Sequence, residues 1–223
     1  LAQLLIRTWI WLSVQVHALA FIKSSPDTQP DRTRRGVSCL ALAAATWGSS
    51  TAYAQQVVAD GITRDVSGPF STIANSAHVF HALNGGIIQN IPGFSVQVTS
   101  SGIGSHALVA GTNGQILLGA GTIITTTNSG SRAIDAGLNS TIAITGATIS
   151  TSGASSTGIT TSAGASVTLT NSSLSTTSSD AISMGGGSVI LDNTSVQPAL
   201  LGAALIGTSN LTLRNGSSIT TTQ

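Results

Sequence analysis

Histidine and aspartate are the side chains of this sequence that could carry metal or acid–base chemistry. The central part of the chain contains His78, His81 and His106. Residues 81–83 and 106–108 both read His-Ala-Leu, which predicts that His81 and His106 occupy equivalent positions one repeat apart. Two histidines that lack a third ligand make a weak zinc site. We therefore expect a stacked pair of rings, no metal site and no cofactor.

Carboxylates are the second group with catalytic potential. Glycoside hydrolysis and related acid–base chemistry need two carboxylates, or a carboxylate and a basic group, on one face. Asp135, Asp180 and Asp192 occupy different positions of the repeat described below, so stacking does not bring them together, and each is predicted to be a turn residue. The sequence contains no G-x-S-x-G, P-loop or G-x-G-x-x-G motif. We predict no catalytic residue and no enzymatic activity.

Charge is unusually sparse in this chain of 223 residues. Only 7% of the residues are charged, against about a quarter in typical soluble domains, and there is no glutamate. After Ala54 the chain has three arginines and five aspartates, a formal net charge of −2. Binding of nucleic acid needs a basic stripe that neutralises phosphates. This composition excludes a nucleic-acid partner.

Residues 31–54 have the three parts of a secretory signal peptide. Arg32, Arg34 and Arg35 precede an apolar run that begins at Val37, and the small-residue site Ala52-Tyr53-Ala54 stands before Gln55. We predict cleavage between Ala54 and Gln55, with a short buried helix as the alternative. The run is too short for a transmembrane helix, which needs about 20 apolar residues. The only cysteine, Cys39, precedes this site, so the exported chain relies on packing rather than disulfides.

Residues 1–30 do not enter the prediction of the fold. The sequence begins with Leu, and its only methionine is Met184. We expect residues 1–30 to be an upstream extension from a mis-set start, and the alternative is an extended signal region. Residues 55–77 are expected to form a cap or lead-in to the repeats.

Apolar residues recur with a period of about 25 residues in the rest of the chain. They fall into three columns, where a column is the set of equivalent positions in successive repeats. In one column the apolar residues come as pairs on either side of a single residue, which is the pattern of a strand with one buried face. The first column pairs Ile116 with Leu118, Ile142 with Ile144, Val167 with Leu169, Val189 with Leu191, and Leu211 with Leu213. The second contains Ile123, Ile149, Leu174, Val196 and Ile219, and the third Leu83, Leu108, Ile134, Ile159, Ile182 and Leu205, with Ile91 and Val98 extending the pattern upstream.

Three columns per repeat predict three short strands per repeat. A unit of this size cannot bury its apolar positions alone, but stacked coils about 4.8 Å apart form one continuous core. Ser, Thr and Gly are poor helix formers, which argues against a helical solenoid. We therefore predict an all-β fold, a right-handed three-sided parallel β-helix of about six coils over residues 78–223, preceded by the signal peptide.

The repeats resemble those of a known family. Residues 146–159 and 166–175, both rich in Ser, Thr and Gly, are similar to passenger-domain repeats of bacterial autotransporters of the pertactin-like group. The resemblance covers residues 78–223 and the signal peptide. It implies export through the periplasm to the cell surface or outer membrane of a Gram-negative bacterium, or secretion, and often a role as an adhesin or virulence factor. It also implies a C-terminal outer-membrane β-barrel, which is missing from this sequence, so we expect a fragment.

Three functions remain open at this point. The first is a structural or adhesive surface rod whose partner is a host surface, carbohydrate or protein ligand. The second is a carbohydrate-active β-helix enzyme of the polysaccharide lyase or hydrolase kind, and the third is a passive stalk that presents a missing domain. Carboxylates clustered on one face would favour the enzyme, whereas a flat surface of Ser, Thr and Asn would favour the rod or the stalk.

Overall fold

Alternating burial explains why this sequence forms strands. The computed structural model describes residues 56–221, and within them 21 short strands account for the regular structure. In β14 (Ser166–Thr170), Val167 and Leu169 are buried, and the residues beside them are partly exposed. Successive side chains of a strand point to opposite faces. Each strand therefore presents its apolar residues to one side and its small polar residues to the other.

The strands assemble into three parallel sheets of seven strands, and each coil of the chain contributes one strand to each sheet. Sheet A contains β1 (Val57–Asp60), β4 (Phe80–Leu83), β7 (Leu108–Ala110), β10 (Ile134–Ala136), β13 (Ile159–Thr161), β16 (Ile182–Met184) and β19 (Ala203–Leu205). Sheet B contains β2 (Thr63–Val66), β5 (Ile87–Asn90), β8 (Gln115–Leu118), β11 (Thr141–Thr145), β14, β17 (Gly187–Asp192) and β20 (Ser209–Arg214). Sheet C contains β3 (Gly68–Thr72), β6 (Val96–Ser100), β9 (Ile123–Thr126), β12 (Thr148–Thr151), β15 (Ser173–Thr176), β18 (Ser195–Gln197) and β21 (Ser218–Ile219).

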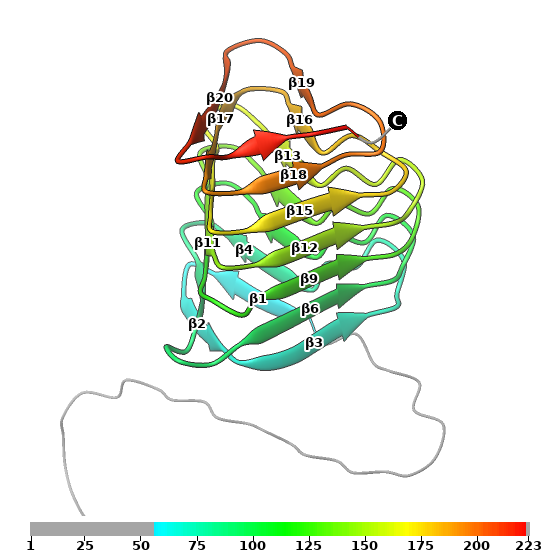
Figure 1. The fold of residues 1–223 in the computed structure, drawn as a ribbon. Helices are drawn as coiled ribbons and strands as arrows, with labels where there is room; N and C mark the ends of the chain where they lie inside the picture. Colours follow the sequence, from blue (N-terminus) through cyan, green and yellow to red (C-terminus); the bar gives the residue numbers. More distant parts are fainter. Residues whose placement is uncertain (1–55, 222–223) are drawn as a thin grey trace, which may run out of the picture. The chain divides into compact units, whose positions relative to one another are not determined.

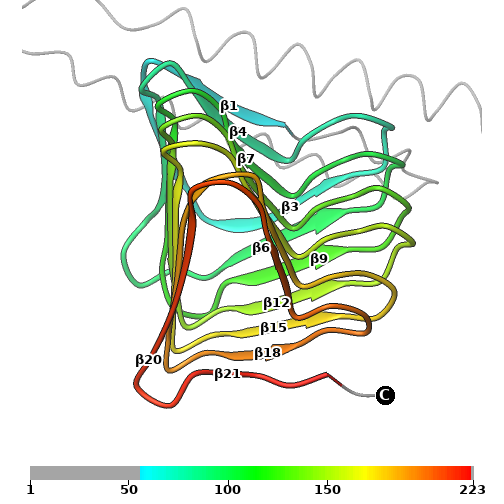
Figure 2. The ribbon, with the colours of Figure 1, turned by 90° about the horizontal axis from the view of Figure 1, so that it is seen from above.

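This arrangement is a three-sided parallel β-helix, which confirms the predicted fold class. Sheet C forms the front of Figure 1, where its strands run to the right and later coils lie above earlier ones, so the coil is right-handed. Seen from above, the three sheets form the three sides of the coil (Figure 2). There are seven coils rather than about six, because β1, β2 and β3 form a first coil within residues 55–77.

Asparagine and glycine shape the corners between the sheets. Several corner residues have a positive φ, a region that Gly, Asn and Asp enter at least cost. Asn113 (φ 57°) and Asn139 (φ 54°) lie at successive corners between sheets A and B. The corners between sheets B and C use Asn171 (φ 49°), Asn193 (φ 47°) and Asn215 (φ 49°) in the same way.

The first predicted column is confirmed at every position. Its members pair in register across sheet B, for example Val167 with Val189 and Leu169 with Leu191. The pairs from coil 3 to coil 6 are buried. In coil 7, the last coil, Leu213 is 44% exposed. The repeat found in the sequence is therefore the repeat of the coil.

The second column contains one error of a single residue. Ile124, not Ile123, pairs with Ile149 and Val98, and Ile124 is fully buried whereas Ile123 is 44% exposed. A slip of one residue along a strand moves a side chain to the opposite face. Upstream, the predicted Ile91 is wrong as well, because Ile88 takes the core position.

The third column is wrong at both of its ends. Phe80, and not Leu83, pairs with Leu108 of the next coil. At the other end Ile182 pairs with Ala203, so Ala203 takes the column position. Leu205 pairs with Met184 instead and is 49% exposed. Both errors arise because the corner segments of these coils differ in length from the others.

Hydroxyl groups are stacked inside the helix beside the apolar core. Ser100, Thr126, Thr151 and Thr176 are buried at the ends of sheet C strands. Their hydroxyls donate to backbone carbonyls of the following corner, as from Thr151 Oγ1 to Ser156 O at 2.9 Å. Buried polar groups need such partners because an unpaired one costs about 1–3 kcal/mol. The small hydroxyl residues therefore provide hydrogen-bond partners for the backbone carbonyls inside the corners.

The predicted signal peptide, residues 31–54, and the predicted upstream extension, residues 1–30, lie outside the residues that the structure describes. Ala52, Ala54 and Gln55, the predicted cleavage site, lie outside residues 56–221. Within these residues the structure contains no helix that is long and apolar enough to span a membrane.

Candidate functional site

Most ionisable side chains of coils 2 to 4 gather at one place on the surface. The segments that join each sheet C strand to the next sheet A strand form what we call the C–A corner, residues 73–79, 101–107 and 127–133 in the first three cases. His78, His106 and Arg132 take the same position in these three segments. The hydrogen bonds between coils show this, because the residue after His78 donates its N–H to the carbonyl of His106, and the residue after His106 donates its N–H to the carbonyl of Arg132. The predicted equivalence of His81 and His106 is therefore wrong, because His81 lies in β4 and pairs with Val109.

The expected stack of two histidines exists, with His78 in place of His81. The rings of His78 and His106 are nearly parallel, with centroids 5.0 Å apart and an interplanar angle of 11°. His81 approaches His78 edge-on at 5.4 Å. We call His78, His81, His106, Arg132 and Asp135 the histidine cluster.

Each ring of the stack accepts a backbone hydrogen bond from the next coil. The N–H of Arg132 donates to His106 Nδ1 at 3.0 Å, and the N–H of His106 reaches His78 Nδ1 at 3.5 Å. Asp180 acts in the same way three coils after His106, where its Oδ1 accepts the N–H of Leu201 at 3.0 Å. Because Nδ1 is an acceptor in both histidines, a neutral ring carries its proton on Nε2.

Asp135 supplies the acidic side of the histidine cluster. It accepts a hydrogen bond from Arg132 Nη1 at 2.9 Å, in a pair that is partly exposed. The distance from its Oδ2 to His106 Nε2 is 3.7 Å, too long for a hydrogen bond. Asp135 is also the middle residue of β10, so the prediction that it is a turn residue is wrong.

Burial keeps the histidines neutral near neutral pH. It lowers the pKa of His106 to about 4; the Asp135 carboxylate opposes this change, and His78 and Arg132 add to it. The pKa of His78 is lowered by burial and by His81, against the opposing effect of Asp135. Burial also lowers the pKa of His81, and the Asp60 carboxylate opposes this change.

The chemistry that the geometry of the histidine cluster supports is proton binding. Among residues 56–221, no group of three or more His, Cys, Asp or Glu side chains could hold a metal ion. A ring whose Nδ1 accepts a backbone N–H can bind a further proton only by losing that hydrogen bond, because both nitrogens of a protonated histidine are donors.

The three aspartates considered as catalytic candidates are on separate parts of the helix. Asp135 lies in sheet A, Asp192 ends β17 in sheet B, and Asp180 lies in the C–A corner before β16. Asp192 accepts a hydrogen bond from Asn215 Nδ2 at 2.6 Å. Stacking does not group these carboxylates, as the sequence predicts. Asp135 forms an ion pair with Arg132, and Asp192 pairs in register with Arg214 of the next coil.

Sheet C is a face of a different kind. Its seven strands carry no charged side chain. Two outward columns consist largely of hydroxyl residues, Thr148, Ser173, Ser195 and Ser218 in one and Thr99, Thr125, Ser150 and Ser175 in the other. Beside this face, the corner between sheets B and C holds an open groove of about 380 Å³, which Asn171, Asn193 and Thr194 help to line.

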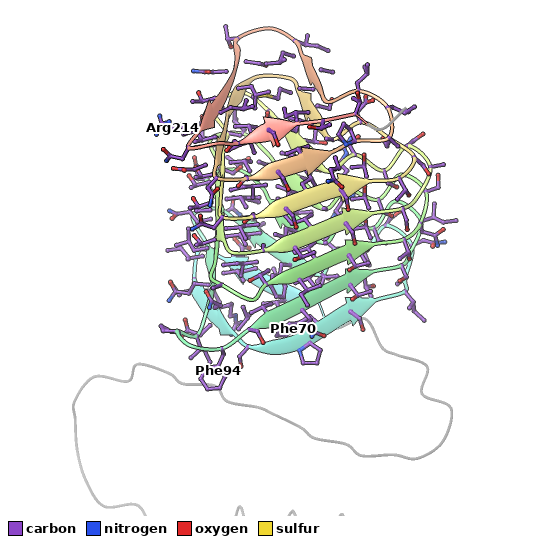
Figure 3. All side chains as sticks on the ribbon, in the orientation of Figure 1. Phe70, Phe94 and Arg214 are labelled. Atoms are coloured by element: carbon purple, nitrogen blue, oxygen red, sulfur yellow. The ribbon has the colours of Figure 1, made fainter. Side chains whose placement is uncertain are left out.

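An aromatic ring stands apart from these polar surfaces. Phe94 lies in the loop between β5 and β6 and is 59% exposed. In Figure 3 it points away from the strands, whereas Arg214 stands at the end of β20. Phe70, by contrast, packs edge-on against Phe80 with ring centroids 5.0 Å apart and closes the core at the first coils.

Sequence reasoning missed His78 and Arg132 as members of one column. The separations of 28 from His78 to His106 and 26 from His106 to Arg132 would have revealed it, since both are close to the coil repeat. The shared His-Ala-Leu sequence of residues 81–83 and 106–108 hid this spacing, because it suggested a different register between the two coils.

No family model, no curated protein and no solved structure matches this chain.

Proposed function

We propose that this chain is an exported passenger segment of the autotransporter kind and serves as a structural or adhesive rod at the bacterial cell surface. The observation that carries the proposal is the β-helix of seven coils, whose single core runs through all of them. A solenoid of this kind is a stiff spacer that exposes an extended surface.

The surface composition supports a role outside the cell without disulfides. The outward columns of sheet C consist largely of hydroxyl side chains and carry no charge, and the buried hydroxyls and corner asparagines bond to the backbone or to one another. Stability then comes from in-register stacking and apolar burial, which need no cysteine. The signal-peptide pattern of residues 31–54 supports export.

Export is tested by expressing the whole chain in a Gram-negative host and sequencing the N-terminus of the exported product. We expect the sequence to begin at Gln55. The matched variant Ala54→Leu, which places a large residue in the small-residue site, should retain an uncleaved chain. An exported wild-type product with an intact N-terminus would refute the cleavage proposal.

Adhesion is tested with the exported product coated on beads. We expect the beads to bind host cells or immobilised glycans, with albumin-coated beads as the control, and protease or glycosidase treatment of the cells distinguishes a protein from a carbohydrate ligand. Absence of binding would favour the stalk. A polysaccharide-degrading activity that is lost in Asp135→Asn would favour the enzyme instead.

A further inference from the structure

The C–A corner is held partly by two hydrogen bonds that depend on unprotonated histidine. Backbone N–H groups of coils 3 and 4 point at Nδ1 of His78 and His106 at 3.5 and 3.0 Å. Both rings are partly buried, and the side chain of His106 is only 15% exposed. A proton on either Nδ1 would place a donor against a donor.

The neighbours of the stack make a second proton costlier than the first. Two protonated rings would lie 5.0 Å apart, centroid to centroid. Of the groups that face them, His81 and Arg132 add positive charge, and Asp135 and the more distant Asp60 add negative charge. Arg132 Nη1 already donates a hydrogen bond to Asp135 Oδ2 at 2.9 Å. The Asp135 carboxylate favours the charged form of His106 more than His78 disfavours it, but burial, the largest effect, outweighs the carboxylate.

We propose that the His78–His106 stack is a pH-dependent latch: neutral rings hold the C–A corner of coils 2 to 4 closed, and protonation releases it. Release breaks the Arg132 N–H and His106 N–H bonds to the rings, while the strands of sheets B and C stay paired. The latch occupies three of the seven coils and leaves the corners of coils 5 to 7, which have no histidine, unaffected.

The direction of the pH dependence follows from the lowered pKa values. An opened corner binds protons near the ordinary histidine pKa of about 6.5, whereas the closed corner resists protonation of His106 down to about pH 4. The closed corner is therefore fully favoured above about pH 6.5 and loses stability as the pH falls toward 4.

Amide hydrogen exchange on the chain, measured by NMR at pH 7.0 and pH 4.5 and corrected for intrinsic exchange rates, tests the latch. We expect the protection of the Arg132 amide to fall at least about tenfold at pH 4.5. The Ile159 amide, which bonds to Ala181 O at 2.8 Å, should change little. Equal protection of the Arg132 amide at the two pH values would overturn the proposal.

Two variants separate ring protonation from other effects of acid. In His78→Asn/His106→Asn the amide oxygen can replace Nδ1 as acceptor without titrating, as Asp180 Oδ1 does for Leu201. Protection in this variant should be similar at pH 7.0 and 4.5, and a loss as large as in the wild type would overturn the proposal. His81→Asn removes a titrating ring that accepts neither bond and should keep the acid-induced loss.

The ring signals of the wild type provide the deciding measurement if the double variant is already unprotected at pH 7.0. Loss of Arg132 protection must then follow the titration of the His78 and His106 rings. Protonated rings beside a fully protected Arg132 amide would show that no latch exists.

Discussion

Two adjacent isoleucines at the start of β9 provide the sharpest test of the coil register. Ile124 is fully buried between Val98 and Ile149 of the neighbouring coils, whereas Ile123 is 44% exposed beside Gln97 and Thr148. Replacing each by alanine removes the same atoms from neighbouring positions. Only the side of the sheet that each side chain occupies differs.

The structure predicts very different costs for the two changes. Truncating a fully buried isoleucine removes its burial and leaves a cavity, at a typical cost of about 2–5 kcal/mol. Full burial of such a side chain is worth about 1.5–3 kcal/mol. Because Ile123 is only roughly half buried, and its truncation leaves no cavity, Ile123→Ala should cost about 1 kcal/mol or less. Ile124→Ala should thus lower the free energy of unfolding by at least about 1 kcal/mol more than Ile123→Ala does.

Urea unfolding followed by far-UV circular dichroism measures this difference. With a slope of about 2 kcal/mol per molar urea, Ile124→Ala should lower the midpoint by about 1–2.5 M and Ile123→Ala by less than about 0.5 M. The slopes of wild type and variants must agree for these free energies to be compared, because solenoids can depart from two-state unfolding. A larger loss for Ile123→Ala, or equal losses, would refute the register of sheet C.

The remaining predictions compare buried with outward positions elsewhere. Val189→Asp places a carboxylate in the fully buried column of sheet B and should unfold the adjacent coils, whereas Thr168→Asp, on the outward face, should be tolerated; equal urea midpoints would contradict the register of sheet B. Ser156→Ala removes the hydroxyl that donates to a carbonyl of the preceding coil at 2.7 Å and accepts a backbone N–H at 3.1 Å, so it should cost about 1–3 kcal/mol. Ser150→Ala, on the outward face of sheet C, is its control and should stay within about 0.5 kcal/mol in the same unfolding assay.

Strand pattern and coil repeat were predictable where the coils are most alike. From coil 4 to coil 6 the core pairs of sheet B recur with nearly constant spacing, and every predicted pair is buried and in register. Alternation within a strand defines which of its sides is apolar, and repetition defines which residues stack. These two periodicities suffice for the fold class because a three-strand unit can bury its apolar side only against copies of itself.

The histidine cluster was predictable only as a pair of rings, and with one wrong partner. The stack of two histidines exists, but the ring opposite His106 belongs to His78. The identical sequence around His81 could not reveal this, since the segment between β5 and β6, residues 91–95, is longer than its counterparts in the later coils and shifts the repeat. Arg132 and Asp135 were not predicted to join the histidines, because no pattern within one repeat links them.

The sequence by itself determined the class of the fold, the repeat and the absence of charge from most of the surface. Only the tertiary structure decided between Ile123 and Ile124, and between Leu83 and Phe80, as members of the core. The physical reason is that neighbouring apolar residues have nearly the same local preference, whereas hydrogen bonding between coils admits one register and so turns one of them inward. Corner lengths, which no core position constrains, set that register coil by coil.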